Sequence, residues 1–400
     1  MVIRKLVPCL VGLTVLTVQP LPGIAQSQPG QPSGQAKPSK LQPAIAPVSQ
    51  LEFPGVDGQL WDSSGQRGDR KALLVAIDRS LRYLQTRQAI EAYRKYIVPG
   101  VTHNRVWRSL QRFRQLLLVA RSPVALQSAV EREFVFYQSA GQDGQGTVAF
   151  TGYFEPIHAA SRVPSRDFPY PIYRLPASFG GWKTPHPTRL QLEGEDGLRF
   201  AQGPLRGSEL AWLSDRLEAY LIQVQGSARL QLTDGSTMSI GYAGHTNYPY
   251  TSIGKELVKA GKIRQEDLTL PALMQYFAKN PADLSVYLPR NQRFVFFAET
   301  GGGAATGSLG VPVTPERSIA TDKSVFPPGA LALIQTQIPY TNPTGQLESR
   351  LVTRYVLDQD TGGAIRGAGR VDIFMGTGKQ AGDRAGLINS PGRLYYLLLK

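Results

Sequence analysis

The chain has 400 residues, a formal net charge of +14 and a pI of about 9.8, and 42% of its residues are hydrophobic. This length suits two domains, and the hydrophobic fraction is large enough for a folded core, which argues against a wholly disordered chain. The basic charge favours a polyanionic partner, but the chain has no zinc-ligand spacing, no RNP-like aromatic run and no lysine-rich tail, so an anionic surface is favoured over nucleic acid. A single cysteine and four scattered histidines provide neither a disulfide framework nor an evident zinc site, so we expect no metal and no cofactor.

The N-terminus has the pattern of an export signal. Arg4 and Lys5 precede an apolar run over residues 7–18, and Gly23-Ile24-Ala25 provides a small-x-small cleavage site. The run is too short for a stable membrane span. We therefore predict a signal peptide over residues 1–25, with a retained membrane anchor as the alternative.

The next segments change from polar to helical to β-rich. Residues 26–55 are rich in Pro, Gln and Ser, which predicts a disordered leader. Apolar residues at helical spacing then predict three helices, at 68–97, 104–120 and 123–134. Short apolar or alternating runs bounded by Gly and Pro predict strands at 148–154, 170–175, 220–225, 228–232, 237–242, 294–297, 330–334, 351–357, 371–374 and 395–399. Two further helices are predicted at 252–260 and 270–278.

Three aspartates lie beside glycine turns in the last third of the chain. A strand, a glycine loop and a return strand would bring Asp360 and Asp372 into one cleft, and Asp322 lies in a similar turn upstream. Neighbouring carboxylates in a partly dry cleft resist simultaneous ionisation, so one is held protonated near neutral pH, as a general acid requires. The alternative is that they are turn residues that bond their own backbone. We expect that turn role for three other aspartates, Asp234, Asp358 and Asp383.

Several ordered motifs carry a family resemblance. Residues 318–378 resemble the three-aspartate (3D) domain. Together with upstream segments, they resemble the membrane-bound lytic murein transglycosylase A family over about residues 60–400. The upstream matches are Phe150-Thr-Gly-Tyr-Phe-Glu-Pro156, Tyr170-Pro-Ile-Tyr-Arg174, Val224-Gln-Gly-Ser227, Gly241-Tyr-Ala-Gly244, Ser252-Ile-Gly-Lys255 and Asn291–Phe297.

The resemblance implies a mainly β fold with N-terminal helices. A double-psi β-barrel catalytic domain would be formed from both chain ends, residues 56–158 and 298–400, with the 3D region at 318–398. A smaller β-barrel domain, residues 159–297, would be inserted between them, with a groove where the two meet.

The resemblance also implies a reaction. A peptidoglycan lytic transglycosylase cleaves the β-1,4 bond between N-acetylmuramic acid and N-acetylglucosamine without water and leaves 1,6-anhydromuramic acid. The catalytic aspartate of the family falls on Asp372, which would act first as general acid and then as base. We expect Asp360 to tune or orient Asp372 as the second catalytic residue, and Asp322 to support them.

Substrate contacts are expected from the ends of strands that face the groove. Thr and Gln suit sugar hydroxyls and acetamido groups, and tyrosine rings stack on sugar faces, although core packing is an equal alternative for tyrosine. The candidates are Thr151, Gly152, Tyr153, Gln225, Gly226 and Ser227. Glu155, the one acid of the first motif, is expected to be a surface or structural residue.

The predicted setting is the periplasm, in association with the outer membrane or the cell wall. No cysteine follows the signal segment to carry a lipid, which favours a soluble or wall-associated form. The expected partners are peptidoglycan glycan strands and enzyme complexes of wall synthesis or hydrolysis, with the protein itself a monomer that binds no nucleic acid. Two other functions stay open: a water-using muramidase-type glycoside hydrolase with Asp360 and Asp372 as its pair, and a non-catalytic wall-binding module.

Overall fold

The structure is a computed structural model that describes residues 44–48, 55–62, 68–199 and 202–400. The predicted signal peptide lies outside the described residues, as does most of the predicted leader. Within that leader, β1 (Ile45–Pro47) pairs antiparallel with a later strand, so this part of the leader is ordered, contrary to the prediction. None of the helices in the described ranges has the length and apolar character to span a bilayer.

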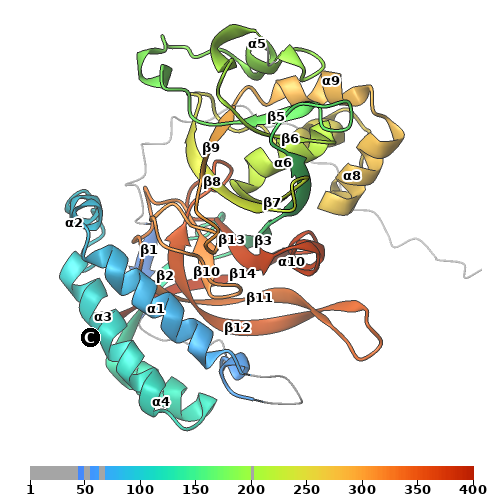
Figure 1. Cartoon of the computed structure of the whole chain (residues 1–400). Helices are drawn as coiled ribbons and strands as arrows, with labels where there is room; N and C mark the ends of the chain where they lie inside the picture. Colours follow the sequence, from blue (N-terminus) through green and yellow to red (C-terminus); the bar gives the residue numbers. More distant parts are fainter. Residues whose placement is uncertain (1–43, 49–54, 63–67, 200–201) are drawn as a thin grey trace, which may run out of the picture. The chain divides into compact units, whose positions relative to one another are not determined.

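Helices dominate the first part of the described chain. They are α1 (Arg70–Leu84), α2 (Arg87–Arg94), α3 (His103–Val119) and α4 (Pro123–Glu133). The single helix predicted at 68–97 is divided, because the Thr86 hydroxyl accepts a hydrogen bond from Ala89 N at 3.2 Å and starts a new helix there. Helices α1 and α3 pack against β12 and β14 of the main sheet (Figure 1).

The main sheet closes into a barrel. Its strands are β1, β2 (Phe134–Ser139), β3 (Val148–Glu155), β10 (Ser318–Ala320), β11 (Leu331–Thr341), β12 (Leu347–Asp360), β13 (Arg370–Thr377) and β14 (Asn389–Leu399). They run in the order β1-β2-β14-β11-β12-β10-β13-β3, and β14 also pairs with β3, so that the six strands from β14 to β3 form a ring. In this ring β3 pairs with β13 and β14, which follow it by more than half of the chain length. The barrel is therefore built from both chain ends, as the family resemblance implies.

A second six-stranded sheet lies between these two parts of the sequence. It contains β4 (Ile157–Ser161), β5 (Tyr170–Tyr173), β6 (Glu209–Leu213), β7 (Ser227–Leu232), β8 (Thr237–His245) and β9 (Val295–Glu299), in the order β5-β6-β4-β7-β8-β9. A bridge from Arg174 to Phe297 joins its two edges. The predicted fold class, mainly β with N-terminal helices and an inserted β-barrel domain, is therefore confirmed; we call the inserted segment from β4 to β9 the insert.

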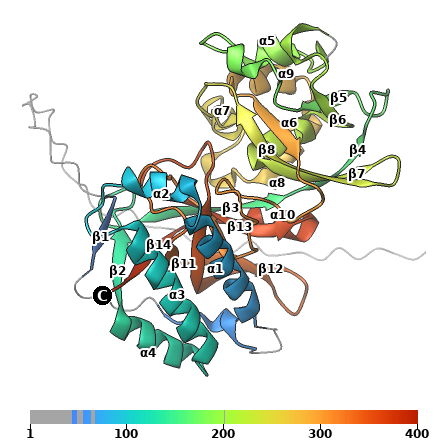
Figure 2. The ribbon, with the colours of Figure 1, turned by 60° about the vertical axis from the view of Figure 1, so that its left-hand side comes forward.

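Short helices accompany both sheets. They are α5 (Arg189–Glu193), α6 (Arg216–Gln225), α7 (Ile253–Lys259), α8 (Leu270–Lys279), α9 (Asp283–Tyr287) and α10 (Lys379–Ala385). Helix α10 packs against β13 and β3 of the main barrel (Figure 2). Short 3-10 helices lie at Gly58–Leu60, Phe179–Gly181, Gly203–Leu205, Gln265–Asp267 and Leu288–Arg290.

The predicted strand at 220–225 is wrong, because these residues form the second half of α6. Asp215 caps the start of this helix by accepting a hydrogen bond from Glu218 N at 2.9 Å, and Gly226 ends it with a φ of 79°. Tyr220 and Ile222 are both buried. A helix covered on several sides places apolar residues at strand spacing as well as at helical spacing, and this pattern misled the prediction.

Candidate active site

Four neighbouring strands place the candidate residues in one row. Ala320, at the end of β10, pairs with Asp360 of β12 on one side and with Asp372 of β13 on the other. Asp372 in turn pairs with Thr151 of β3. Residues that pair across adjacent strands have their side chains on the same face of the sheet. The structure thus brings Asp360 and Asp372 to one face of the barrel wall, as the strand–loop–strand pattern predicts.

Asp372 is a half-buried carboxyl with few stabilising contacts. Its side chain is 19% exposed, and its Oδ1 accepts a hydrogen bond from the Thr151 hydroxyl. Arg370 Nη2 lies 3.7 Å from the same oxygen and donates to Thr151 Oγ1 at 3.2 Å. Burial raises the pKa of Asp372 to about 6, since it outweighs the opposing charge of Arg370 and is reinforced by Asp360. Asp372 is therefore half protonated at about pH 6, and roughly one molecule in ten still carries the proton at pH 7.

Asp360 accepts several hydrogen bonds. Its Oδ2 accepts from the Tyr153 hydroxyl at 2.8 Å, and its Oδ1 accepts from the backbone N–H groups of Ser308 and Thr361, each at 2.8 Å. Burial raises the pKa of Asp360, although these hydrogen bonds oppose the rise. Both carboxylate oxygens are thus occupied by donors that fix their position.

Asp322 is held in a turn and does not join the pair. Its Oδ1 accepts from Ser324 N at 3.0 Å and from the Ser324 hydroxyl at 2.6 Å, and its Oδ2 accepts from Gly367 N at 2.7 Å. Burial acts to raise the pKa of Asp322, but these hydrogen bonds outweigh it and the pKa is lowered. Asp322 therefore carries a negative charge that ties the loop between β12 and β13 to the end of β10.

Asp358 is not the turn residue that the sequence analysis expects. It lies in β12, is fully buried, and accepts a hydrogen bond from the Tyr396 hydroxyl at 2.7 Å while it pairs with Lys323. Burial raises the pKa of Asp358 against the opposing charge of Lys323. Asp358 thus forms a buried ion pair with Lys323 that the sequence pattern did not reveal.

The two other expected turn aspartates differ from each other. Asp234 accepts a hydrogen bond from Ser236 N at 2.8 Å, so the expected turn role is confirmed. Asp383 lies instead in α10 and pairs with Lys379 at 2.7 Å across one helical turn. The expected turn role of Asp383 is therefore wrong.

Two of the three candidates on β3 face the aspartates. Thr151 and Tyr153 bond Asp372 and Asp360, and the Tyr153 ring also packs on Phe374 with centroids 5.2 Å apart, so this tyrosine belongs both to the site and to a small apolar cluster. Gly152 lies on the opposite face of the strand. A Cβ there would lie 2.8 Å from the Cα of Ala385 in α10. This glycine therefore permits close packing of α10 against β3, and its contact with sugar stays a prediction.

The other three candidates lie where α6 meets β7. Gln225 Oε1 accepts a hydrogen bond from Phe154 N at 3.2 Å, which fixes the end of α6 against β3. Gly226 is half-buried, and Ser227 is only 8% exposed because it pairs with Gly241 of β8. Of these three residues, Gln225 is the one whose side chain bonds β3, the strand that also carries Thr151 and Tyr153.

Sequence reasoning missed two residues beside Asp372. Arg370 is the first, and its Nε is buried without a hydrogen-bond partner among the described residues. The second is Tyr250, in the segment before α7. Burial raises the pKa of Tyr250, and the charges of Arg370 and Asp372 also act on it, so its phenol is within electrostatic reach of both. A tyrosine in a polar loop carries no sequence signal for this position, because only the fold of the insert brings it there.

Glu155 is structural and buried, so the surface alternative is wrong. It is 1% exposed and accepts hydrogen bonds from the Thr377 hydroxyl at 2.7 Å and from Arg229 Nη2 at 3.3 Å. These contacts join the end of β3 to β13 and to β7 of the insert.

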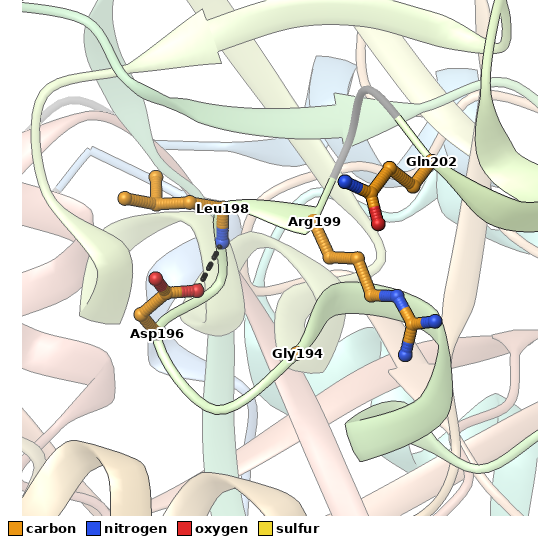
Figure 3. A pocket seen from close by; sticks show the side chains of 5 residues that line it. All are labelled: Gly194, Asp196, Leu198, Arg199 and Gln202. Carbon is orange, nitrogen blue, oxygen red and sulfur yellow. Dashed lines mark hydrogen bonds between the residues drawn. The ribbon is translucent and has the colours of Figure 1, made fainter.

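A pocket in the insert is separate from the candidate aspartates Asp322, Asp360 and Asp372, none of which lines it. Figure 3 shows this pocket of about 290 Å³, lined by Gly194, Asp196, Leu198, Arg199 and Gln202. Asp196 accepts a hydrogen bond from Leu198 N at 2.9 Å, which accounts for its carboxylate as a turn residue. Within the described ranges, no three His, Cys, Asp or Glu side chains gather as metal ligands would.

The fold is built on two β-barrels, and one of them carries a row of partly buried aspartates on its wall. Comparison with known families agrees: the MltA specific insert domain matches residues 149–298, and the 3D domain matches residues 317–398. The membrane-bound lytic murein transglycosylase A of Escherichia coli K12 is 32% identical over 263 residues, which are 65% of this chain and 68% of that protein. The same-named protein of Vibrio cholerae is 33% identical over 267 residues, 66% of this chain and 68% of its own.

A solved structure gives the same result. The crystal structure of Escherichia coli MltA with bound chitohexaose matches with a TM-score of 0.67 and 26% identity, over 90% of this chain and 95% of that one. The chain belongs to the membrane-bound lytic murein transglycosylase A family. This confirms the family resemblance and the prediction of an enzyme of the lytic transglycosylase class.

Proposed function

We propose that the protein cleaves peptidoglycan glycan strands at the β-1,4 bond between N-acetylmuramic acid and N-acetylglucosamine and leaves a 1,6-anhydromuramic end. The names of the relatives and the glycan bound to the Escherichia coli structure support a wall polysaccharide as substrate. The observation that carries the proposal is the half-buried Asp372, whose pKa is raised to about 6 beside a second, tightly bonded aspartate. A carboxyl with this pKa can donate a proton near neutral pH and take one back.

The proposed reaction uses one carboxyl twice. Protonated Asp372 donates its proton to the glycosidic oxygen as the bond from that oxygen to C1 of muramic acid breaks. The C6 hydroxyl oxygen of the same muramic acid then forms a bond to C1, and its proton passes to the Asp372 carboxylate. The acid is restored and no water is consumed, because the nucleophile is part of the substrate.

The neighbours of Asp372 suit supporting roles in this reaction. The Thr151 hydroxyl fixes Oδ1, and Arg370 lies close enough to stabilise the carboxylate form after proton donation. Asp360 adds negative charge that keeps the pKa of Asp372 high, and the Tyr153 hydroxyl holds Asp360 in place. Tyr250 and Gln225 lie at the insert side of the row, where they suit contacts to sugar hydroxyls and acetamido groups.

The water-using hydrolase is a weaker proposal. A conventional glycosidase needs a second carboxyl that is free to act as nucleophile or to activate water. Asp360 accepts three hydrogen bonds, which leaves it poorly suited to either task. A buried carboxyl with a raised pKa lowers the folding free energy available at neutral pH. A wall-binding module without activity would gain nothing from such a residue.

The products of digestion test the proposal. Purified peptidoglycan treated with wild-type protein is expected to yield anhydromuramyl ends by mass spectrometry, whereas reducing ends would favour the hydrolase. Asp372→Asn is expected to lose at least about a hundredfold in rate, the usual contribution of a general acid. Asp383→Asn, which removes an exposed carboxyl from α10, is the matched control and is expected to keep the wild-type rate. Cleavage by Asp372→Asn at the wild-type rate would refute the assignment.

We further propose that the protein is exported to the periplasm and acts at the outer membrane or the cell wall. The relatives are named as membrane-bound, and the N-terminal sequence has the pattern of a signal peptide. N-terminal sequencing of the protein from cell envelopes is expected to begin at Gln26. A monomeric state and partners among wall enzymes remain predictions.

A further inference from the structure

Two arginines meet beside the loop that joins Asp360 to Asp372. Arg366 lies within this loop and is exposed, whereas Arg293 reaches it from the insert, just before β9. A Cβ at Gly363 would lie only 3.1 Å from Cζ of Arg293, so the glycine leaves the space in which the guanidinium rests on the loop backbone. The segment between the two candidate catalytic aspartates therefore carries two cations, one of its own and one from the insert.

In the described part of the chain no ion pair involves either guanidinium, and the nearby acid on which the charge of Arg366 acts is Asp322, which is already held by three hydrogen bonds. Elsewhere the protein supplies acids to its buried arginines: Arg317 pairs with Asp57, and Arg384 pairs with Glu316. Arg293 is half-buried, and burial lowers its pKa, as does the charge of Arg366. A partly dehydrated cation beside a like charge is unfavourable unless an anion joins it.

The same part of the insert borders both the arginines and the catalytic aspartate. Burial lowers the pKa of His245, and the charges of Arg293 and Arg366 lower it further, so both arginines are within electrostatic reach of this β8 residue. The charge of Asp372 likewise acts on Tyr250, five residues further along the chain. Gly363, against which the Arg293 guanidinium lies, follows Asp360 by three residues, so at most about 11 Å of backbone separates this glycine from the aspartate. The arginines therefore border the loop between the two candidate catalytic aspartates.

We propose that Arg293 and Arg366 form a carboxylate-binding site for the stem peptides of peptidoglycan, so that the enzyme selects peptide-bearing strands over bare glycan. This inference rests on the proposed function. In a peptide-bearing strand the lactyl carboxyl of each muramic acid is held in an amide bond, so the sugars are neutral and the free carboxylates lie on the stem peptides, farther from the sugar ring. Two guanidinium groups suit them, since each planar fork can donate two parallel hydrogen bonds to one carboxylate.

The test compares two forms of one substrate. Soluble glycan strands that keep their stem peptides are set against the same strands stripped by an amidase, which removes the peptide carboxylates and leaves one lactyl carboxylate on each muramic acid, and kcat/KM is measured for each. Wild type is expected to favour the peptide-bearing strands. Arg293→Gln and Arg366→Gln are each expected to lower that preference roughly tenfold, the scale of one lost charge-assisted contact, and Arg293→Lys is expected to retain part of it. Arg206→Gln, at an exposed arginine of the insert, is the matched control and is expected to keep the wild-type preference.

A binding measurement separates this inference from the proposed function. In the Asp372→Asn background, affinity for both strand types is measured by calorimetry. Tighter binding of peptide-bearing strands, lost in Arg293→Gln, supports the carboxylate site even if no anhydro product forms, in which case only the proposed reaction fails. Equal loss of binding and kcat/KM on both strand types, or a wild type without preference, would overturn the carboxylate site.

Discussion

At the scale of single residues, the site depends on how few contacts Asp372 has compared with its neighbours. Asp322 and Asp360 are each held by three hydrogen bonds, whereas Asp372 has the Thr151 hydroxyl and the more distant Arg370. The sequence marked all three aspartates, because each lies beside a glycine turn. The residue pattern alone could not rank them, because the donors that distinguish them, such as Tyr153 for Asp360 and Thr151 for Asp372, come from residues far away in the chain.

The raised pKa of Asp372 predicts a stability gain on its replacement. The folded-state pKa of about 6 exceeds the unfolded value of about 4, so the stabilising effect of protonated Asp372 is complete below pH 4 and is lost as the pH rises through 6. Asn does not ionise. The free energy of unfolding of Asp372→Asn, relative to wild type, is expected to rise by about 2–3 kcal/mol between pH 4 and pH 8. Urea unfolding at both values measures it; a difference that does not vary with pH would contradict the raised pKa.

The charge on Asp360 predicts a shift in the pH profile of activity. Above pH 6 the acid form of Asp372 is depleted, so kcat/KM is expected to fall about tenfold per pH unit. Asp360→Asn removes a negative charge that raises the pKa of Asp372, so the fall is expected to begin at lower pH. A profile that is reduced in height but unmoved would mean that Asp360 serves only the structure; Asp383→Asn is again the control.

At the scale of elements, β3 serves two purposes on its two faces. Thr151 and Tyr153 point to the aspartates, while Gly152 between them allows α10 to approach the strand. The alternation of a strand could be predicted from the sequence. The closeness of α10 could not, because a glycine in a motif is equally consistent with a sugar contact.

Gly152→Ala is expected to destabilise the barrel. The new Cβ would meet backbone atoms of Ala385 at 2.8 and 2.9 Å, and backbone cannot yield as a flexible side chain does. A loss of about 1–3 kcal/mol in the free energy of unfolding is expected from such overpacking. Gly180→Ala is the matched control, since a Cβ there meets nothing within 4 Å and the change should remain within about 0.5 kcal/mol. Equal urea midpoints for the two variants would contradict the close approach.

At the scale of the whole molecule, a buried ion cluster fixes an early segment to the barrel. Arg317, fully buried, pairs with Asp57 and Asp69, and Asp57 also pairs with Arg354 of β12. The family resemblance predicted that early and late residues share one barrel. It did not predict this cluster, since single charged residues in a loop carry no pairing signal.

Asp57→Ala is expected to cost about 3–5 kcal/mol of folding free energy, because it leaves two buried guanidinium groups with a missing partner. The exposed pair of Arg350 and Glu348 gives the comparison: Glu348→Ala is expected to cost about 0–1 kcal/mol. Chemical denaturation of both variants at pH 7 measures the contrast. Similar midpoints for the two would show that Asp57 is not held in a buried ion pair as described.

The order of the strands also sets an order of events as a ribosome makes the chain. All strands of the insert lie between Ile157 and Glu299, so it can complete its sheet while later residues are still being added. β3, by contrast, must wait for β13 and β14 before its edges are covered. The surroundings of Asp372 are thus completed only at the very end of translation, when β13 and β14 have both been made.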